Sequence, residues 1–213
     1  MKKLYIIGAG GFGREVAWLV ERINEENPTW SFQGFIDDDK EKWNTYENDY
    51  KVCGSCDYLM QIAEKEECYA VCAIGSAKNR KCVIGKMNGS KIKYATLVDP
   101  SVISSKHVEI GEGSIICAGT ILTVDIKIGN HVIVNLDCTI GHDAIIEDYV
   151  TIYPSVNVSG MTQVNECVEL GTGTQIIQGR KIGAKCIIGA GSVVVKDIGK
   201  SGTYVGIPAK RIK

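Results

Sequence analysis

The chain lacks several features that mark whole classes of protein. Its 24 Lys and Arg balance 25 Asp and Glu, so it lacks the basic surplus typical of nucleic-acid-binding proteins. No apolar run approaches the ~20 residues of a membrane-spanning helix. The apolar stretch at 4–7 gives way to glycines at once, which predicts a first β-strand rather than a signal peptide. We therefore expect no nucleic-acid partner and no membrane partner.

Proline is scarce, with four residues against 24 glycines, so many tight turns must form without it. The nine cysteines are an odd number and follow no secretory signal, which favours reduced thiols in the cytoplasm over a disulfide framework. Cys53 and Cys56 have the spacing of half a zinc site, with Cys68 and Cys72 further on. No second pair with that spacing follows, so we expect no metal.

A six-residue repeat fills the second half of the chain. From Ile110 to Val194 an aliphatic residue recurs at every sixth position, 15 times without a break, and small or β-branched residues dominate four positions later. A period of six fits neither a helix nor a half-buried strand. It is typical of a β-helix, in which three short strands and three corners make one 18-residue coil. The repeat predicts five coils with both kinds of residue pointing inward.

One inward position carries a charge. Arg180 stands where the repeat places a small residue, and a buried charge is costly unless it is paired. We expect a local bulge or an outward turn at 178–180.

The first part of the chain alternates strands and helices. The pattern predicts strands at 4–7, 32–36, 70–74 and 92–98, with helices at 14–23, 58–66 and 79–87. Such alternation is typical of a small parallel sheet with right-handed crossovers. We expect two domains, residues 1–95 with a Rossmann-like α/β fold and residues 96–213 with the repeat.

A glycine motif, G-x-G-x-x-G, occupies 8–13 between the first expected strand and helix. This is a place to hold a phosphate against backbone N–H groups. Asp37 ends the second expected strand, where a carboxylate can hold ribose hydroxyls, and Gly75 would line the same crevice. NAD is one possible ligand, but no dehydrogenase domain follows, so another nucleotide is favoured. The alternative is a glycine turn that only packs the helix on the strand.

The three histidines are His107, His131 and His142. They raise a zinc-hydrolase hypothesis, as in β-helical carbonic anhydrases. The spacing places His107 and His142 on one edge about 10 Å apart and His131 on another, too far for Zn–N bonds of ~2 Å unless a trimer joins different edges. His142 sits on an outward corner beside Asp143, a pairing suited to a general base. For His107 and His131 we expect surface positions with no role.

The motifs together resemble a known family. The repeat, the segment 135–143 (NLDCTIGHD) and the segment 205–210 (VGIPAK) resemble hexapeptide-repeat acyltransferases that use acetyl-CoA. With GAGGFG and IDDD added, the whole chain resembles sugar O-/N-acetyltransferases of the sialic acid O-acetyltransferase and UDP-bacillosamine N-acetyltransferase type, the NeuD/PglD-like family. The resemblance implies a left-handed parallel β-helix after the α/β domain, and a homotrimer with active sites between subunits.

The resemblance also implies roles for individual residues. His142 matches the catalytic base and Asp143 the carboxylate that raises its basicity. The positions that match the nucleotide-sugar pocket are Gly11, Phe12, Gly13, Asp37, Asp38 and Gly75. Those at or near the acetyl-CoA contacts are Thr151, Gly160, Thr172 and Ala190. Some members have a histidine where Phe12 stands, a departure that bears on the sugar and its nucleotide.

The function implied is transfer of an acetyl group from the co-substrate acetyl-CoA to an amine, with the 4-amino group of a UDP-linked amino sugar as the expected acceptor. His142 would deprotonate the acceptor, and the Gly160 N–H would stabilise the oxyanion. One alternative is O-acetylation of sialic acid or another sugar. Two further alternatives are a non-catalytic β-helix scaffold and a nucleotide-binding module.

Overall fold

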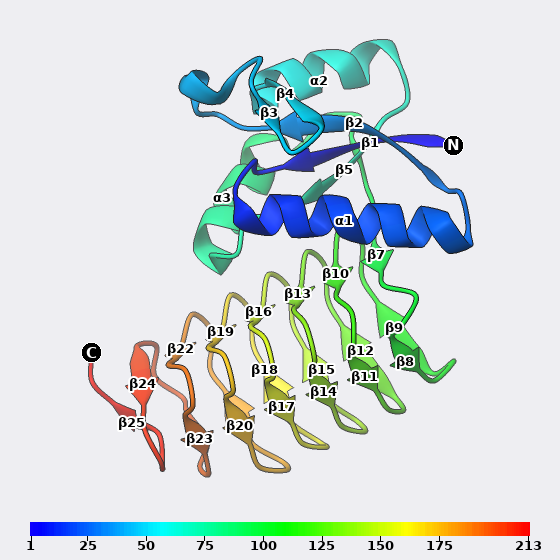
Figure 1. Ribbon diagram of the computed structural model, residues 1–213. Coiled ribbons are helices and arrows are strands. Elements are labelled where there is room, and N and C mark those ends of the chain that lie inside the picture. Colours follow the sequence, from blue (N-terminus) through cyan, green and yellow to red (C-terminus); the bar gives the residue numbers. More distant parts are fainter.

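The computed structural model describes residues 1–213 and has two units, an α/β unit and a prism of short strands (Figure 1). The α/β unit is built on a six-stranded sheet of order β3-β4-β2-β1-β5-β6. Its strands are β1 (Lys2–Ile7), β2 (Trp30–Ile36), β3 (Tyr46–Glu47), β4 (Tyr50–Gly54), β5 (Tyr69–Cys72) and β6 (Lys93–Tyr94). All neighbours are parallel except β3 and β4, an antiparallel hairpin that the sequence did not predict.

Helices cover both faces of this sheet, because the side chains of β1 alternate between the two faces and are buried on each. Leu4 and Ile6 pack against one helix, while Tyr5 and Ile7 point to the opposite face and its two helices. These helices are α1 (Gly11–Glu26) on the first face, and α2 (Cys56–Lys65) and α3 (Ala77–Lys86) on the second, with a 3₁₀ turn, η1, at Lys40–Lys42. The three predicted helices are confirmed, although each begins two or three residues earlier than expected.

The second unit confirms the predicted β-helix, left-handed and parallel. Each strand from Leu97 to Val194 pairs with the strand 18 residues away, as Ile133 does with Ile115 and with Thr151. The last two strands, Thr203–Val205 and Lys210–Arg211, depart from this spacing and pair with each other antiparallel. The first sheet contains β7 (Leu97–Val98), β10 (Ile115–Ile116), β13 (Ile133–Val134), β16 (Thr151–Ile152), β19 (Glu169–Leu170), β22 (Ile187–Ile188), β24 (Thr203–Val205) and β25 (Lys210–Arg211). The second contains β8 (Ile103–Ser104), β11 (Ile121–Leu122), β14 (Thr139–Ile140), β17 (Asn157–Val158), β20 (Gln175–Ile176) and β23 (Val193–Val194). The third contains β9 (Val108–Ile110), β12 (Ile126–Ile128), β15 (Ile145–Ile146), β18 (Gln163–Val164) and β21 (Lys181–Ile182).

The expected strand at 92–98 is wrong. It divides into β6, which closes the N-terminal sheet, and β7, which starts the prism, so the chain changes sheets between Tyr94 and Leu97. The sequence does not reveal this change, because only two residues separate β6 from β7 and no turn signal lies between them. The coils begin at β7, two strands before the first repeat residue, Ile110.

The inward pattern of the repeat is also confirmed. Every aliphatic repeat residue after Ile110 is buried. The small slots are fully buried from Ser114 to Ser192 at every position except Arg180, and they include the thiols of Cys138 and Cys186. The inward side chains of each coil stack on those of the next coil, and this stacking makes one continuous core.

The corners are made by left-handed residues rather than by proline. The second residue of each turn from Gly113 to Gly191 has positive φ, supplied by glycine at some corners and by residues such as Asp143 and Tyr149 at others. Arg180 lies just after such a turn, whose geometry is regular, so there is no bulge. Its side chain is 34% exposed and its guanidinium lies 3.5 Å from Asp197. The charge thus leaves the slot and pairs outside.

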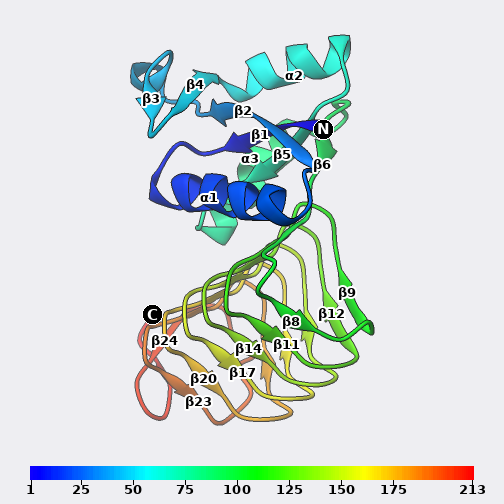
Figure 2. The same ribbon diagram turned by 45° about the vertical axis from the view of Figure 1, so that its right-hand side comes forward.

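The α/β unit rests on the first sheet of the prism, with α1 between the two sheets (Figures 1 and 2). Ile115 and Ile133 join the apolar cluster around α1. Arg22 of α1 forms a salt bridge with Asp99 beside one corner of the prism, with 2.7 Å between Nε and Oδ2. Helix α3 contacts the prism at the corners that contain Tyr149 and Glu166. The turns from the second sheet to the third, such as β14 to β15, lie on the remaining edge, away from the α/β unit (Figure 1). None of the helices is both long and apolar enough to span a membrane.

Candidate functional site

His142 occupies the turn between β14 and β15, on the edge that the α/β unit does not contact. Its Nδ1 lies 2.7 Å from Oδ2 of Asp143, and both side chains are more than half exposed. The pair forms because Asp143 takes the left-handed conformation, φ 58°, that the corners of this edge share from Asp125 to Gly179. A carboxylate on Nδ1 leaves Nε2 as the nitrogen free to accept a proton.

Gly160 is the residue one coil further along this edge, and it lies beneath the imidazole. A Cβ built at Gly160 would come within 2.6 Å of Nε2, so only glycine leaves room for the ring in this position. The backbone N–H of Gly160 donates no hydrogen bond within the chain. The structure therefore brings His142, Asp143 and Gly160 together, as expected from the sequence.

A second candidate site lies at the carboxyl ends of the strands of the α/β sheet. A pocket of about 300 Å³ opens there between β1, β2 and β5. Its lining residues are Ile7, Gly8, Gly10, Ile36, Asp37, Asp38, Cys56, Ala73, Ile74 and Val83. Ligands of open parallel sheets bind at this position.

The three motif glycines have separate physical tasks. Gly8 takes φ 103° to turn the chain, Gly10 has open space where a Cβ would be, and a Cβ at Gly13 would lie 2.0 Å from the Gly8 carbonyl oxygen. Gly10 and Gly8 line the pocket, whereas Gly13 only packs helix against loop. The whole motif was expected to hold a phosphate, but the residues that the resemblance placed in the pocket, Gly11, Phe12 and Gly13, do not line it, whereas Gly8 and Gly10 do.

The first turn of α1 nevertheless retains a binding role for the backbone. The N–H groups of Gly11, Phe12 and Gly13 come before the first intrahelical donor, the Arg14 N–H, and the N-cap Gly10 has no side chain to accept from them. They are donors suited to a phosphate at the positive end of the helix. The Phe12 ring packs on the core around α1 and does not line the pocket.

Asp37 and Asp38 carry the negative charge of the pocket. Asp37 Oδ2 accepts from the Ala9 N–H at 3.1 Å and from the Lys42 ammonium at 3.0 Å. Burial would raise the pKa of Asp37, but these donors and the Asp39 N–H outweigh burial, so its pKa is lowered. Asp38 accepts from the Cys56 N–H, which lowers its pKa against the opposing effect of burial. Both carboxylates are therefore ionised. Asp37 stabilises the glycine loop and Asp38 the start of α2 through these hydrogen bonds.

Gly75 and Thr151 meet at the junction of the two units. The Thr151 hydroxyl donates to the Gly75 carbonyl oxygen at 2.6 Å, and Thr151 is only 1% exposed. Its side chain is thus enclosed between the units in this chain, and its expected contact with acetyl-CoA stays a prediction. Gly75 lies next to the pocket-lining Ile74 but does not line the pocket itself.

The remaining expected acetyl-CoA contacts fall on a different edge from His142. Thr172 and Ala190 are exposed turn residues one coil apart, at the corners that follow the first sheet. His142 and Gly160 lie at corners that follow the second sheet. One chain by itself does not bring these two pairs together.

The expectation of a surface position is wrong for His131. It is 4% exposed, stacks on Tyr149 and meets Tyr94 edge-on, with ring centroids 5.2 and 4.7 Å away. Burial and the nearby charge of Arg80 lower the pKa of His131 to about 4. His107 is exposed on the His142 edge. No three His, Cys, Asp or Glu side chains gather as a metal site requires.

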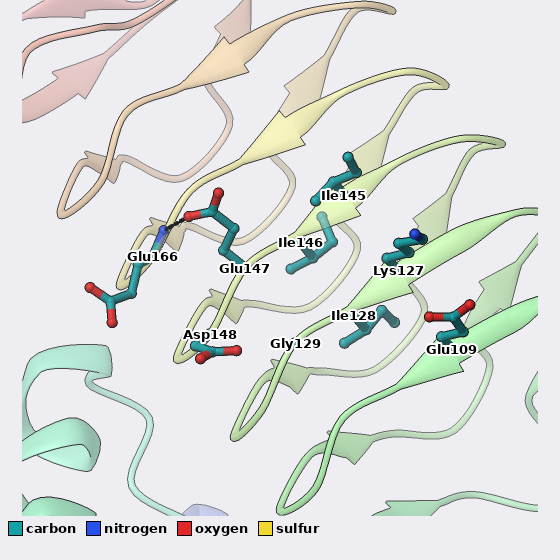
Figure 3. Close-up of a pocket in the computed structure, with 9 residues that line it drawn as sticks. All are labelled: Glu109, Lys127, Ile128, Gly129, Ile145, Ile146, Glu147, Asp148 and Glu166. Atoms are coloured by element: carbon teal, nitrogen blue, oxygen red, sulfur yellow. Dashed lines mark hydrogen bonds between the residues drawn. The ribbon is translucent and has the colours of Figure 1, made fainter.

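Another hollow, of about 480 Å³, runs along the outer face of β9, β12 and β15 (Figure 3). It is acidic, with Glu109, Glu147, Asp148 and Glu166 around Lys127. Two of these carboxylates are engaged in turns, since Glu147 accepts from the Glu166 N–H and Asp148 from the Asn130 N–H. The hollow contains neither a histidine nor a residue of the α/β unit, so we assign the chemistry elsewhere.

The chain is similar to known proteins over both units. Residues 3–87 match the family described as the PglD N-terminal domain. A GDP-perosamine N-acetyltransferase of Escherichia coli O157:H7 is 29% identical over 187 residues, covering 87% of this chain and 82% of that protein.

Two solved structures share the whole architecture. One is a histidine-to-asparagine mutant of perosamine N-acetyltransferase from Caulobacter crescentus in complex with CoA and GDP-perosamine, with a TM-score of 0.89, 28% identity and coverage of 100% of this chain and 98% of that one. The other is the acetyltransferase domain of PglB from Neisseria gonorrhoeae FA1090 in complex with acetyl coenzyme A, with a TM-score of 0.88, 28% identity and 99% coverage of both chains.

Proposed function

Because the chain belongs to the NeuD/PglD-like family of hexapeptide-repeat sugar acetyltransferases, we propose that it moves the acetyl group of acetyl-CoA to the amino group of a nucleotide-linked sugar, with His142 as general base. The observation that carries the proposal is the His142–Asp143 pair, held on an open corner with Nε2 unobstructed by any Cβ at Gly160.

In the mechanism, His142 Nε2 takes a proton from the acceptor as its amine nitrogen attacks the thioester carbonyl carbon. Asp143 stabilises the resulting imidazolium through Nδ1. The Gly160 N–H, which has no partner in the chain, is a donor for the oxyanion. The C–S bond then breaks, and the CoA thiolate leaves with the proton from His142. No covalent enzyme intermediate is needed.

The acceptor is held by the α/β unit in this proposal. Phosphate oxygens would lie against the N–H groups of the first turn of α1, next to Gly10, and the carboxylates of Asp37 and Asp38 remain on the ribose side. The sugar would be an amino sugar, since a relative and a solved structure that match most of this chain are N-acetyltransferases of GDP-perosamine. That name favours a GDP carrier over the UDP carrier expected from the sequence, so both are tested below.

A homotrimer would complete the site. His142 lies on the edge away from the α/β unit, so the nucleotide pocket and the base of one chain cannot serve one acceptor. Thr172 and Ala190 lie on a further edge, and contact between copies would bring different edges together. Exposed apolar side chains follow the His142 edge: Val124, Ile145, Met161, Ile177 and Val195. Such a row is typical of a protein interface.

We place the reaction in the cytoplasm. All nine cysteines are free thiols, seven of them buried, which is typical of a reducing compartment. Acetylation of a sugar hydroxyl is the second candidate activity, because one general base can serve an amine or a hydroxyl equally.

The deciding experiment is release of CoA thiol from acetyl-CoA with a panel of acceptors: GDP-perosamine, a UDP-4-amino-4,6-dideoxy sugar, a dTDP analogue and free sialic acid. We expect His142-dependent release with one nucleotide-linked amino sugar. Release with sialic acid alone would make the protein an O-acetyltransferase. Silence across the panel without acetyl-CoA binding would favour the scaffold, and nucleotide binding alone would favour the binding module. Light scattering should give three times the 23.1 kDa chain mass.

A further inference from the structure

Arg80 of α3 is fully buried at the junction between the two units, with no carboxylate within ion-pair distance. Its guanidinium is satisfied by six oxygen acceptors instead. It donates to the carbonyl oxygens of His131, Ile74, Gly75, Tyr149 and Val150 and to the Thr151 hydroxyl, at 2.6 to 3.1 Å. Burial lowers the pKa of Arg80, yet a guanidinium remains protonated at any physiological pH.

These acceptors come from two parts of the molecule. Ile74 and Gly75 form the tip that follows β5, and Ile74 lines the nucleotide pocket. The carbonyls of His131 and Tyr149 belong to successive corners of the prism. The planar guanidinium of Arg80 thus joins the edge of the pocket to two coils at once. The ammonium group of a lysine is too compact to reach acceptors on all three segments.

Thr151 completes the arrangement from the prism. Its hydroxyl donates to the Gly75 carbonyl oxygen at 2.6 Å and accepts from Arg80 at 2.9 Å. The same outward position is occupied by Ile133 one coil before and by Glu169 one coil after. Glu169 extends the contact, because it accepts from the Ala77 N–H at the start of α3. The 74–77 segment is therefore held by hydrogen bonds along its whole length.

We propose that Arg80 and Thr151 are positioning residues for the acceptor: they fix the Ile74–Gly75 edge of the nucleotide pocket on the prism and so set how the bound sugar is presented to the catalytic histidine. The inference rests on the proposed function. Neither side chain lines the pocket, so both act through the Ile74–Gly75 backbone. A misplacement of the acceptor by about 1 Å can cost about 100-fold in rate, so even a small shift of the Ile74–Gly75 edge should be measurable.

Thr151→Val tests the proposal most sharply, because it removes the hydroxyl while keeping the shape of the side chain. Thr151→Ser keeps the hydroxyl. Arg80→Lys keeps the charge but loses the planar donor set, and Lys81→Met is the matched control. Lys81 is the next residue of α3 and also bridges to the prism, through Glu166, but from an exposed position.

The readouts are KM and kcat for both substrates, the melting temperature, and calorimetric Kd values for acetyl-CoA, GDP and UDP. We expect Thr151→Val to lower kcat/KM for the acceptor about 10-fold, and Arg80→Lys to lower it further. The Kd of acetyl-CoA should stay within about twofold, since it binds elsewhere. Thr151→Ser and Lys81→Met should behave as wild type.

Two results would overturn the proposal. One is a wild-type acceptor kcat/KM in Thr151→Val, and the other is a weaker acetyl-CoA Kd, which would return Thr151 to the acetyl-CoA site. If Arg80→Lys does not fold, Thr151→Val decides alone. If the wild-type protein acetylates no acceptor, the proposed function fails. The positioning role is then decided by nucleotide binding to Thr151→Val. Weaker binding of GDP or UDP than in wild type would support that role, and unchanged binding would refute it.

Discussion

The imidazole Nδ1 of His142 lies 2.7 Å from the carboxylate of Asp143, although the two residues are adjacent in the chain. Neighbouring side chains usually diverge, and they meet here because the corner puts Asp143 in the left-handed conformation. The same backbone geometry that closes each coil therefore also creates the acid–base pair. The opposite face of the ring rests on Gly160 of the next coil.

Asp143→Asn should lower kcat about 10-fold or more, and less than the ~10²–10⁴-fold loss expected for His142→Ala. An amide can still contact Nδ1 but cannot stabilise the imidazolium by charge. Asparagine tolerates the left-handed conformation, so the melting temperature should stay near that of wild type. Stopped assays of CoA release and thermal melts measure both quantities. A wild-type kcat for Asp143→Asn would show that the carboxylate has no part in the reaction.

Gly160→Ala should displace the imidazole and lower kcat about 10-fold or more, with little effect on stability. The added methyl would meet Nε2, Cε1 and Cδ2 of His142 within 2.9 Å, and an exposed ring can swing away at small cost. Gly199→Ala is the matched control, because a Cβ at Gly199 meets nothing within 4 Å. Equal activity of the two variants would contradict a catalytic position for this ring.

Much of the fold could be predicted from the sequence because the repeat encodes it directly. A period of six fixed by buried aliphatic residues leaves one way to stack the coils, and the order of strands and helices is local information. The β3–β4 hairpin and the change of sheet between Tyr94 and Leu97 could not be predicted. Both depend on which sheet a short apolar segment joins, which only tertiary packing decides.

The site could be predicted where its residues are adjacent in the sequence. It could not be predicted where the contacts join elements that are far apart in the sequence. His142 and Asp143 stand out because they are adjacent and interrupt an apolar repeat. Arg80 gives no such signal, since its six acceptors are mostly backbone carbonyls from other elements. The surroundings of Thr151 could not be predicted for the same reason: the repeat places it on an outward position, and nothing in its sequence shows that the α/β unit covers it.

Gly10→Ala and Gly13→Ala should separate ligand contact from packing in the glycine motif. A Cβ at Gly10 is unopposed and points to open space, so the variant should keep its stability but bind GDP or UDP about 10-fold more weakly or worse. A Cβ at Gly13 would strike the Gly8 carbonyl, so that variant should lose about 1–3 kcal/mol of unfolding free energy. Calorimetry and denaturant unfolding distinguish the two. Unaltered nucleotide affinity in Gly10→Ala would remove this loop from the binding site.

His131 should make the protein lose stability on mild acidification. Its pKa in the folded chain is lowered from 6.5 to about 4, by burial first and by the charge of Arg80 second. Between these values the unfolded chain binds a proton that the folded chain refuses, so unfolding free energy falls as the pH falls. The full effect is roughly 3 kcal/mol, reached only near the folded pKa. Asp37, Asp38 and Asp99, whose pKa values are lowered, contribute stability that is lost only at more acidic pH.

Denaturant unfolding at steps from about pH 7 to about pH 5.5 isolates this effect, because the pKa values of Asp37, Asp38 and Asp99 are lowered from an ordinary value of 3.8 and lie below that range. His131→Phe keeps an aromatic ring between Tyr94 and Tyr149 but cannot take up a proton, so its stability should be nearly flat over the range. His107→Phe is the control, since that histidine is exposed and should leave the wild-type slope in place. A wild-type slope in His131→Phe would mean that the acid sensitivity of the protein arises at another group.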